Sequence, residues 1–135
     1  MEIYLVRHTS VDVPAGYAYG QTDVPLRSSF EDEAEVVKKT LSGHTFDKVL
    51  SSPLTRCVRL ANYCGYPNAE KEDRIKEISF GEWEMKSWDE LSSDPRSEAW
   101  FNDWINVPAP SGESLQDQYN RVSRFLDEIR ESGLQ

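Results

Sequence analysis

Two short stretches of this chain hold side chains that suit the transfer of a phosphoryl group. Arg7 and His8 stand together near the start, and Arg56 follows a Ser-Ser-Pro-Leu-Thr sequence. Guanidinium groups are planar and permanently charged, and they pair bidentately with phosphate oxygens. A histidine held among them can attack phosphorus through an unprotonated ring nitrogen and form a phosphohistidine that water later hydrolyses. His8 is therefore the candidate nucleophile, and Arg7 and Arg56 are the candidate phosphate ligands.

The same reaction needs an acid, because the alcohol that leaves phosphorus must gain a proton. A carboxylic acid beside the phosphate can supply that proton where burial has raised its pKa. Glu77, Glu82 and Glu84 lie close together in the sequence and are the candidates. Each of them is an ordinary exposed carboxylate in the simpler interpretation. The residues alone leave the choice of acid open.

Short apolar runs precede both arginine-bearing stretches. Residues 2–6 are mostly apolar and end abruptly at Arg7, and residues 48–50 run into a pair of serines. We expect both runs to be buried strands of a parallel sheet. Ligands of such sheets bind at the carboxyl ends of the strands. The sequence therefore predicts that His8 and Arg56 reach a common site.

Helical spacing of apolar residues follows each expected strand. One helix is expected over residues 30–41 with Ser29 as its cap, and another from Pro53 to Gly65 with Ser52 as its cap. This order is the βαβ pattern of a parallel sheet that carries helices on both faces. Two loops are also expected, a long one over residues 10–27 and a structured one over residues 74–85. One or two short helices are expected over residues 88–104, with a break at Asp94-Pro95. A last helix is expected from Ser114 to Gly133, with Ser114 and Asp117 as a capping box.

The composition predicts one globular α/β domain over residues 1–135. Lys and Arg total 15 against 24 Asp and Glu, and this net charge of -9 argues against nucleic acid as a partner but not against a small anion in an arginine-lined cleft.

No stretch approaches the ~20 apolar residues of a membrane span. Cys57 and Cys64 are expected about 10 Å apart on one helix, too far for a disulfide, which agrees with a cytoplasmic protein.

Metal and cofactor sites find no support in the sequence. His8 and His44 are its two histidines, they lack metal-ligand spacing, and the glycines are too scattered for a nucleotide-binding loop. We interpret His44 as a loop residue. Tryptophans at helical spacing are more often core residues than pocket residues, and Trp83 is the one that we consider for a substrate pocket. The alternative interpretation of Arg56 is a helix-surface arginine that is paired with a nearby carboxylate.

Three motifs occur in the order found in one enzyme superfamily. They are Leu5-Val6-Arg7-His8-Thr9, Ser51-Ser52-Pro53-Leu54-Thr55-Arg56-Cys57 and Glu77-Ile78-Ser79-Phe80-Gly81-Glu82-Trp83-Glu84. Together they resemble the histidine phosphatase (phosphoglycerate mutase-like) superfamily, and Ser111-Gly112-Glu113-Ser114 before the last helix extends the likeness. The resemblance implies that His8 is phosphorylated, that Arg7 and Arg56 bind phosphate, and that Glu77 is the acid.

Further stretches look most like the α-ribazole phosphatases within that superfamily. They are Tyr19-Gly20-Gln21-Thr22-Asp23-Val24-Pro25-Leu26, Phe80-Gly81-Glu82-Trp83-Glu84-Met85 and Asn102-Asp103-Trp104. This likeness implies a phosphomonoesterase that acts on α-ribazole 5'-phosphate in cobalamin nucleotide-loop assembly, with Gln21 and Thr22 among the substrate-binding residues. A broad-specificity phosphatase and a phosphoglycerate mutase are the nearest alternatives.

The likeness ends at Gln135, whereas members of the superfamily continue into another strand that ends in a second pocket histidine. His44 does not match that position. We expect either a piece of a longer protein or a naturally short, impaired relative, and the intact motifs favour the piece. The expected fold is accordingly incomplete at its C-terminal end. A non-catalytic phosphate-binding module is the alternative from another functional class.

Overall fold

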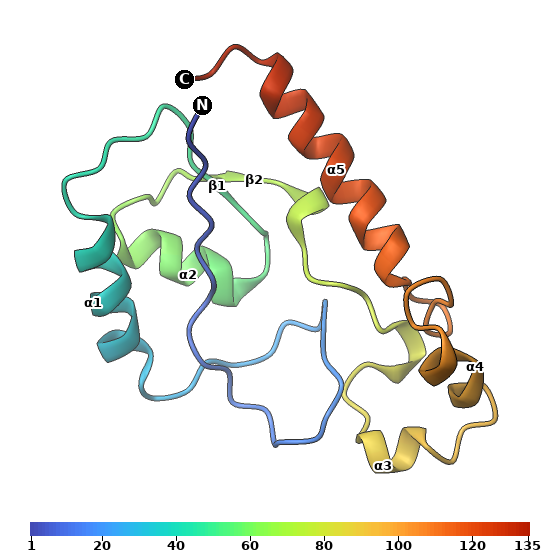
Figure 1. Cartoon of the computed structure of the whole chain (residues 1–135). Helices are drawn as coiled ribbons and strands as arrows, with labels where there is room; N and C mark the ends of the chain where they lie inside the picture. The colour runs from blue at the N-terminus through green and yellow to red at the C-terminus, as the bar shows by residue number, and fades with distance from the viewer. The chain divides into compact units, whose positions relative to one another are not determined.

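The computed structural model describes all 135 residues, which form two compact units that are each discontinuous in sequence. Unit 1 comprises Met1–Asp12, Asp23–Lys76 and Leu126–Gln135, and unit 2 comprises Val13–Thr22 and Glu77–Phe125. Figure 1 traces the chain through both units from its blue N-terminus to its red C-terminus. The expectation of a single domain over residues 1–135 stays a prediction.

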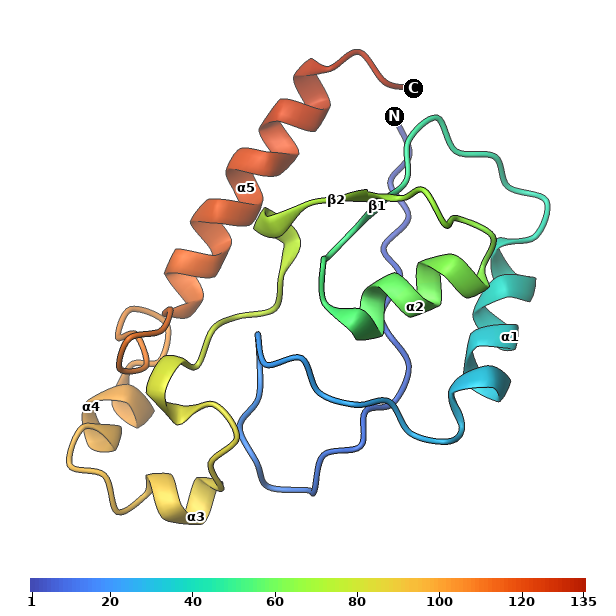
Figure 2. The same ribbon diagram turned by 180° about the vertical axis from the view of Figure 1, so that it is seen from behind.

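Unit 1 contains a minimal parallel sheet beside two packed helices. Strands β1 (Leu50–Ser51) and β2 (Glu70–Lys71) pair in parallel, with Leu50 opposite Glu70. Helix α1 (Phe30–Leu41) packs on α2 (Thr55–Tyr63) through a small core, and the pair is seen from behind in Figure 2. The members of that core with the most buried side chains are Phe30, Ala34 and Leu60. Parallel pairing with covering helices is the expected α/β pattern.

The expected first strand over residues 2–6 is wrong for this structure. Residues 1–10 form no strand, and Leu5 exposes 90% of its surface, with Ile3 at 50% and Val6 at 48%. A strand is defined by hydrogen bonds to a neighbouring strand, and no such ladder reaches this segment. An apolar run identifies a segment that is suited to burial, but it does not supply the neighbour that would bury it.

Three smaller expectations about unit 1 also need correction. The second strand lies at Leu50–Ser51 rather than at residues 48–50, and β2 was not expected at all, because Glu-Lys carries no strand signal. Helix α2 begins at Thr55 rather than at Pro53 and ends at Tyr63. Ser29 precedes α1 without capping it, because its hydroxyl donates to the Glu33 carboxylate (2.7 Å) instead of accepting from the backbone.

Unit 2 is organised around an aromatic core. The 3-10 helix η2 (Gly81–Trp83), α3 (Trp88–Leu91) and α4 (Ser97–Asn102) surround the buried side chains of Trp83 and Leu91. The two helices α3 and α4 break near Asp94-Pro95, as expected. Trp83 is 1% exposed and donates its indole N–H to Asp94, so the idea that it lines a substrate pocket is wrong and it is a core residue. A second 3-10 helix, η1 (Asp73–Ile75), belongs to unit 1.

The last helix, α5 (Leu115–Glu131), begins with the expected capping box. The Asp117 backbone N–H donates to the Ser114 hydroxyl (3.1 Å), and the Ser114 backbone N–H donates to the Asp117 carboxylate (2.9 Å). These reciprocal bonds satisfy donors that a helix start otherwise leaves unpaired. The N-terminal turns of α5 belong to unit 2, and its last residues belong to unit 1. None of the helices is both long enough and apolar enough to span a membrane.

Candidate active site

His8 has the ring orientation that a nucleophilic histidine needs. Its side chain is partly buried, and its Nδ1 lies 2.7 Å from the backbone carbonyl oxygen of Thr9. A carbonyl can only accept a hydrogen bond, so this contact places the proton on Nδ1 and leaves the lone pair of the neutral ring on Nε2. Nε2 is therefore the nitrogen that is available for attack on phosphorus.

The two candidate phosphate ligands differ sharply in environment. Arg56 is only 1% exposed, whereas Arg7 is exposed. The interpretation of Arg56 as a helix-surface arginine is therefore wrong, because its side chain is buried. A guanidinium stays charged even when buried, and charges are kept inside proteins where ionic or hydrogen-bonding groups compensate them. Strand β1 leads through Ser52 into the helix that carries Arg56, as the sequence predicted.

The N-terminus of α2 is already capped from within the chain. The Asp23 carboxylate accepts from the Thr55 backbone N–H (3.0 Å) and from the Thr55 hydroxyl (2.7 Å). The Leu54 backbone N–H donates to the hydroxyl of Ser52 (3.4 Å). The backbone N–H of Thr55 is therefore not available to bind a phosphate. Asp23 is a residue that sequence reasoning missed, although Asp is a frequent N-terminal cap.

The predicted substrate-binding residues Gln21 and Thr22 lie in unit 2, in a loop that Glu84 holds. The Glu84 carboxylate accepts from the backbone N–H groups of Gly20 (2.9 Å) and Thr22 (2.8 Å) and from the Thr22 hydroxyl (3.1 Å). Gly20 has no room for a side chain, since a Cβ there would lie 1.7 Å from the carbonyl oxygen of Ile78. Glu84 is therefore committed to the shape of the loop.

The three candidate acids differ in the contacts that their carboxylates make. Glu84 is occupied by the loop, and Glu82 forms an exposed ion pair with Arg96 at 2.8 Å. Glu77 has no ion pair; its Oε1 accepts from the backbone N–H of Ile78 (2.9 Å) and from the side chain of Gln118 (3.4 Å). Its side chain is exposed, which differs from the burial expected of the acid. Glu77 nevertheless remains the carboxylate of the three with the fewest structural commitments.

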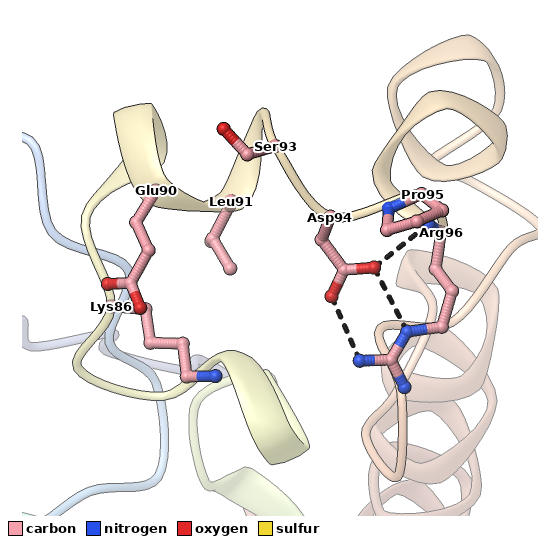
Figure 3. A pocket seen from close by; sticks show the side chains of 7 residues that line it. All are labelled: Lys86, Glu90, Leu91, Ser93, Asp94, Pro95 and Arg96. Carbon is pink, nitrogen blue, oxygen red and sulfur yellow. Dashed lines mark hydrogen bonds and ion pairs between the residues drawn. The ribbon is translucent and has the colours of Figure 1, made fainter.

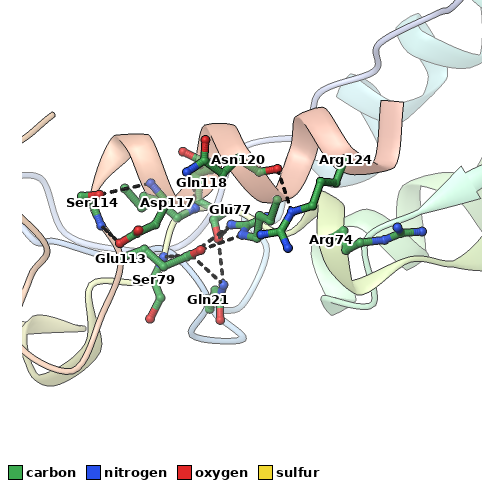
Figure 4. Close-up of polar contacts among 12 residues, drawn as sticks. Gln21, Arg74, Glu77, Ser79, Glu113, Ser114, Asp117, Gln118, Asn120 and Arg124 are labelled. Atoms are coloured by element: carbon green, nitrogen blue, oxygen red, sulfur yellow. Dashed lines mark hydrogen bonds and ion pairs between the residues drawn. The ribbon is translucent and has the colours of Figure 1, made fainter. Parts of the chain in front are cut away.

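A fourth acidic residue, Glu113, organises the surroundings of Glu77 and was missed by sequence reasoning. Its carboxylate accepts from the backbone N–H of Ser79 (3.0 Å), from the side chain of Gln21 (3.3 Å) and from Arg121 at 2.7 Å. Figure 4 shows Gln21, Ser79 and Glu113 converging beside Glu77. In the sequence, Glu113 is part of the Ser-Gly-Glu-Ser stretch that supports the family resemblance, but this stretch indicates no role for the residue.

Arg7, His8 and Arg56 thus belong to unit 1, while the other site residues belong to unit 2. Gln21 and Glu77 are in direct contact, because the Gln21 side-chain amide donates to the Glu77 carbonyl oxygen at 3.1 Å. The convergence of His8 with both arginines on one phosphate stays a prediction. Thr9 adds a further polar group beside the nucleophile, since its hydroxyl is buried without a hydrogen-bond partner.

A cavity of about 500 Å³ in unit 2 contains none of these residues. Figure 3 shows it between Lys86 on one side and Asp94 and Arg96 on the other. Hydrogen bonds from Arg96 hold the pKa of Asp94 well below its ordinary value, and the two side chains form an ion pair at 2.9 Å. Asp94 and Arg96 thus pair with each other, whereas Lys86 and Glu90 form no ion pair.

The chain is similar to proteins of known activity along most of its length. It is 33% identical to "Phosphoserine phosphatase 1" of Hydrogenobacter thermophilus, a match that covers 96% of this chain and 64% of that relative. It is 30% identical to "Adenosylcobalamin/alpha-ribazole phosphatase" of Escherichia coli, which covers 97% of this chain and 68% of that relative. The chain thus spans about two thirds of the length of these relatives.

Solved structures show the same relationship. A phosphoglycerate mutase from Thermus thermophilus superimposes with a TM-score of 0.70 at 29% identity, over 89% of this chain and 68% of that one. This match confirms the predicted phosphoglycerate mutase-like α/β fold, and it also confirms that the fold is incomplete relative to its neighbours. The sequence profile of the histidine phosphatase superfamily (branch 1) matches residues 3–134 of this chain. This chain belongs to the histidine phosphatase superfamily, branch 1.

Proposed function

We propose that the chain carries the nucleophilic part of a phosphomonoesterase that works through a phosphohistidine on His8. The contact between His8 Nδ1 and the Thr9 carbonyl oxygen (2.7 Å) is the observation that carries this proposal. It places the proton of the neutral ring on Nδ1 and leaves the lone pair on Nε2. Membership of the superfamily supports the reaction type. Arg7 and Arg56 neutralise the phosphate oxygens.

The proposed reaction proceeds in two displacements. Nε2 of His8 bonds to phosphorus as the bond between phosphorus and the ester oxygen breaks, and Glu77 gives its proton to that departing oxygen. Glu77, now a carboxylate, then takes a proton from a water molecule that attacks the phosphohistidine. This second step breaks the nitrogen–phosphorus bond, releases inorganic phosphate and returns His8 to its neutral form.

The substrate that we propose is α-ribazole 5'-phosphate, bound with the help of Gln21 and Thr22. The similarity to the Escherichia coli relative supports this choice, and the similarity to the phosphoserine phosphatase makes phosphoserine the first competitor. Phosphoglycerate and a broad range of esters are further alternatives. We propose the cytoplasm as the location, because such soluble phosphate esters are made and used there.

The decisive experiment compares the two histidines of the chain. His8→Ala is expected to lower turnover of a phosphomonoester at least about 10³-fold, because the covalent intermediate can no longer form. His44→Ala is the matched control; its Nδ1 lies 3.1 Å from the Tyr4 hydroxyl, in a loop, and it should retain full turnover. Acid-labile, base-stable phosphate on the wild-type chain and not on the His8 variant would identify the intermediate. Equal loss in both variants would contradict the proposal.

A panel of esters then tests the substrate. α-Ribazole 5'-phosphate, phosphoserine, 3-phosphoglycerate and p-nitrophenyl phosphate are compared by kcat/KM, and equal values for all four would contradict the narrow specificity.

A non-catalytic phosphate-binding module is the second candidate, and the exposed side chain of Glu77 is the observation that favours it. The sequence predicts a buried carboxylic acid as the proton donor, and the exposed side chain of Glu77 does not meet that prediction. This candidate predicts that phosphate raises the melting temperature of the chain while no ester is hydrolysed. Hydrolysis that disappears in His8→Ala and persists in His44→Ala would exclude it.

A further inference from the structure

We propose that Glu113 and Arg121 act as a pair of positioning residues that fix Glu77 and Gln21 for the reaction. This inference rests on the proposed role of Glu77 as the acid. It concerns only unit 2, where all four residues lie. Neither residue of the pair is assigned a contact with substrate. The pair acts through the backbone of residue 77 and through the side chain of Gln21.

The ion pair is bidentate and largely sheltered from solvent. Nε of Arg121 donates to Oε2 of Glu113 at 2.7 Å, and Nη2 of Arg121 donates to Oε1 at 3.1 Å. The side chains of Arg121 and Glu113 are only 16% and 20% exposed. Parallel guanidinium–carboxylate bonds of this kind set an orientation as well as a distance. A sheltered pair is also less screened by salt than a surface pair.

The pair forms hydrogen bonds with the main chain at Glu77 and Ser79. Nη2 of Arg121, besides its bond to Glu113, donates to the carbonyl oxygen of Glu77 at 2.9 Å. Two residues further on, the backbone N–H of Ser79 donates to Oε1 of Glu113 at 3.0 Å. The peptide groups on both sides of Ile78 are therefore tied to one ion pair. This arrangement fixes the point from which the Glu77 side chain projects.

Gln21 closes the arrangement from the other segment of unit 2. Its side-chain amide donates to the carbonyl oxygen of Glu77 (3.1 Å) and to Oε1 of Glu113 (3.3 Å). Arg121 and Gln21 thus bind the same two acceptors, so that a shift of one changes the bonds of the other. The candidate acid and a candidate substrate-binding residue share one support (Figure 4).

General-acid catalysis depends steeply on position, and displacement of a reacting group by about 1 Å can cost on the order of 10²-fold in rate. The side chain of Glu77 is exposed and makes no ion pair of its own, so its position depends on its backbone. A lysine at position 121 has a single ammonium group and cannot reproduce the planar fork that serves Glu113 and the Glu77 carbonyl together. We therefore expect the arginine itself to be required.

The test uses the full chain and exploits the dependence of the reaction on its leaving group. Loss of a well-placed acid slows esters of alkyl alcohols, which leave poorly, and has little effect on p-nitrophenyl phosphate, which leaves as a stable phenolate. Arg121→Ala, Arg121→Lys and Glu113→Ala are each expected to lower the single-turnover rate of alcohol release from an alkyl phosphate roughly 30-fold, while changing the single-turnover rate of p-nitrophenol release less than about 3-fold. Single-turnover rates isolate the first displacement from the later hydrolysis of the phosphohistidine, in which Glu77 acts on every substrate. Arg124→Ala is the matched control.

The control removes the same charge one turn further along α5. Nε of Arg124 bonds only the carbonyl of Asn120 in its own helix, at 3.3 Å, and its loss should change neither rate. An equal fall of both rates in Arg121→Ala would indicate general damage and contradict the positioning role. Full recovery of the alkyl rate in Arg121→Lys would contradict it as well.

Amide hydrogen exchange separates this inference from the proposed function. The Ser79 amide, which donates to Glu113, is expected to exchange at least about 10-fold faster in Glu113→Ala and Arg121→Ala than in Arg124→Ala. Unchanged exchange at Ser79 would overturn the positioning role even if the chain is an active phosphatase. A chain that hydrolyses no ester but shows faster exchange at Ser79 in the two variants would mean that Glu113 and Arg121 hold this backbone without serving a catalytic acid. That outcome would overturn the catalytic part of the inference.

Discussion

The segment that leads to the candidate nucleophile His8 and the segment that carries the candidate acid Glu77 are held in opposite ways. Residues 1–6 form no sheet ladder, and Leu5 is 90% exposed. The Tyr4 ring lies 5.0 Å from the His44 ring at an angle of 56°, one of the few contacts of this segment. Residues 77–84 are tied down by two carboxylates, since Glu113 binds the backbone of Ser79 and Glu84 binds the loop of Gly20.

The two halves of the proposed chemistry therefore have different structural needs. A histidine nucleophile needs mainly the correct tautomer, and a single carbonyl beside His8 provides it. A proton donor needs a defined position, which depends on several chain segments. The following experiments test whether the two regions differ in stability as they differ in packing.

The largest expected effect comes from truncating one leucine in each region. Leu91 is 2% exposed in the aromatic core of unit 2, and Leu91→Ala should lower the free energy of unfolding by about 3 kcal/mol, from lost burial and the cavity that remains. Leu5→Ala should change it by less than about 0.5 kcal/mol, because the side chain is already in solvent. Urea denaturation measures both. Similar losses for the two variants would break the comparison.

A smaller effect is expected when the glutamate that holds the Gly20 loop is removed. Glu84→Ala leaves the N–H groups of Gly20 and Thr22 without their acceptor and should cost about 2 kcal/mol. Glu82→Ala is the matched control, two residues earlier, where the ion pair with Arg96 is half exposed and should contribute less than about 0.5 kcal/mol. Thermal unfolding distinguishes them, and a control that costs as much as Glu84→Ala would refute the structural role of Glu84.

The smallest effect concerns acid. Hydrogen bonds from the Arg74 side chain and backbone lower the pKa of Glu72 in unit 1 from 4.5 to about 2. A lowered folded pKa stabilises the chain above the unfolded value, so this contribution is complete above about pH 4.5 and is lost as the pH falls towards 2. Glu72→Gln should remove about 1 kcal/mol at neutral pH and flatten the acid limb of the stability curve.

The control for the acid experiment is the next residue in the chain. Asp73 has a side chain that is 80% exposed, and Asp73→Asn should leave the pH dependence of stability nearly unchanged. Urea midpoints between pH 2 and pH 7 provide the comparison. A wild-type curve that is already flat over this range would show that the Glu72 pair contributes nothing.

The sequence allowed the helices to be predicted better than the strands. Helix α1 and the capping box of α5 have local signals, such as spaced apolar residues and the Ser114–Asp117 pair, that act within a few residues. Strands depend on partners from elsewhere in the chain. That is why residues 2–6 were wrongly predicted as a strand and Glu70–Lys71 was missed.

The site residues divide in the same way. The types of His8 and Arg56 and their order in the chain pointed to phosphate chemistry without any knowledge of the fold. Asp23, Glu113 and Arg121 could not be identified, because each acts on a residue that is distant in sequence: Asp23 on Thr55, and Glu113 on Ser79. Long-range hydrogen bonds leave no periodic pattern in the chain.

The close approach of Gly20 to the Ile78 carbonyl also bears on how substrate preference can diverge in this protein. Any side chain at position 20 would collide with the backbone, since a Cβ would lie 1.7 Å from that oxygen. Gln21 and Thr22, the next two residues, are only partly buried and can be exchanged without this collision. Under the proposed substrate-binding role of Gln21 and Thr22, variation of specificity, in nature or in a randomised library, should therefore accumulate at these two positions around an invariant glycine.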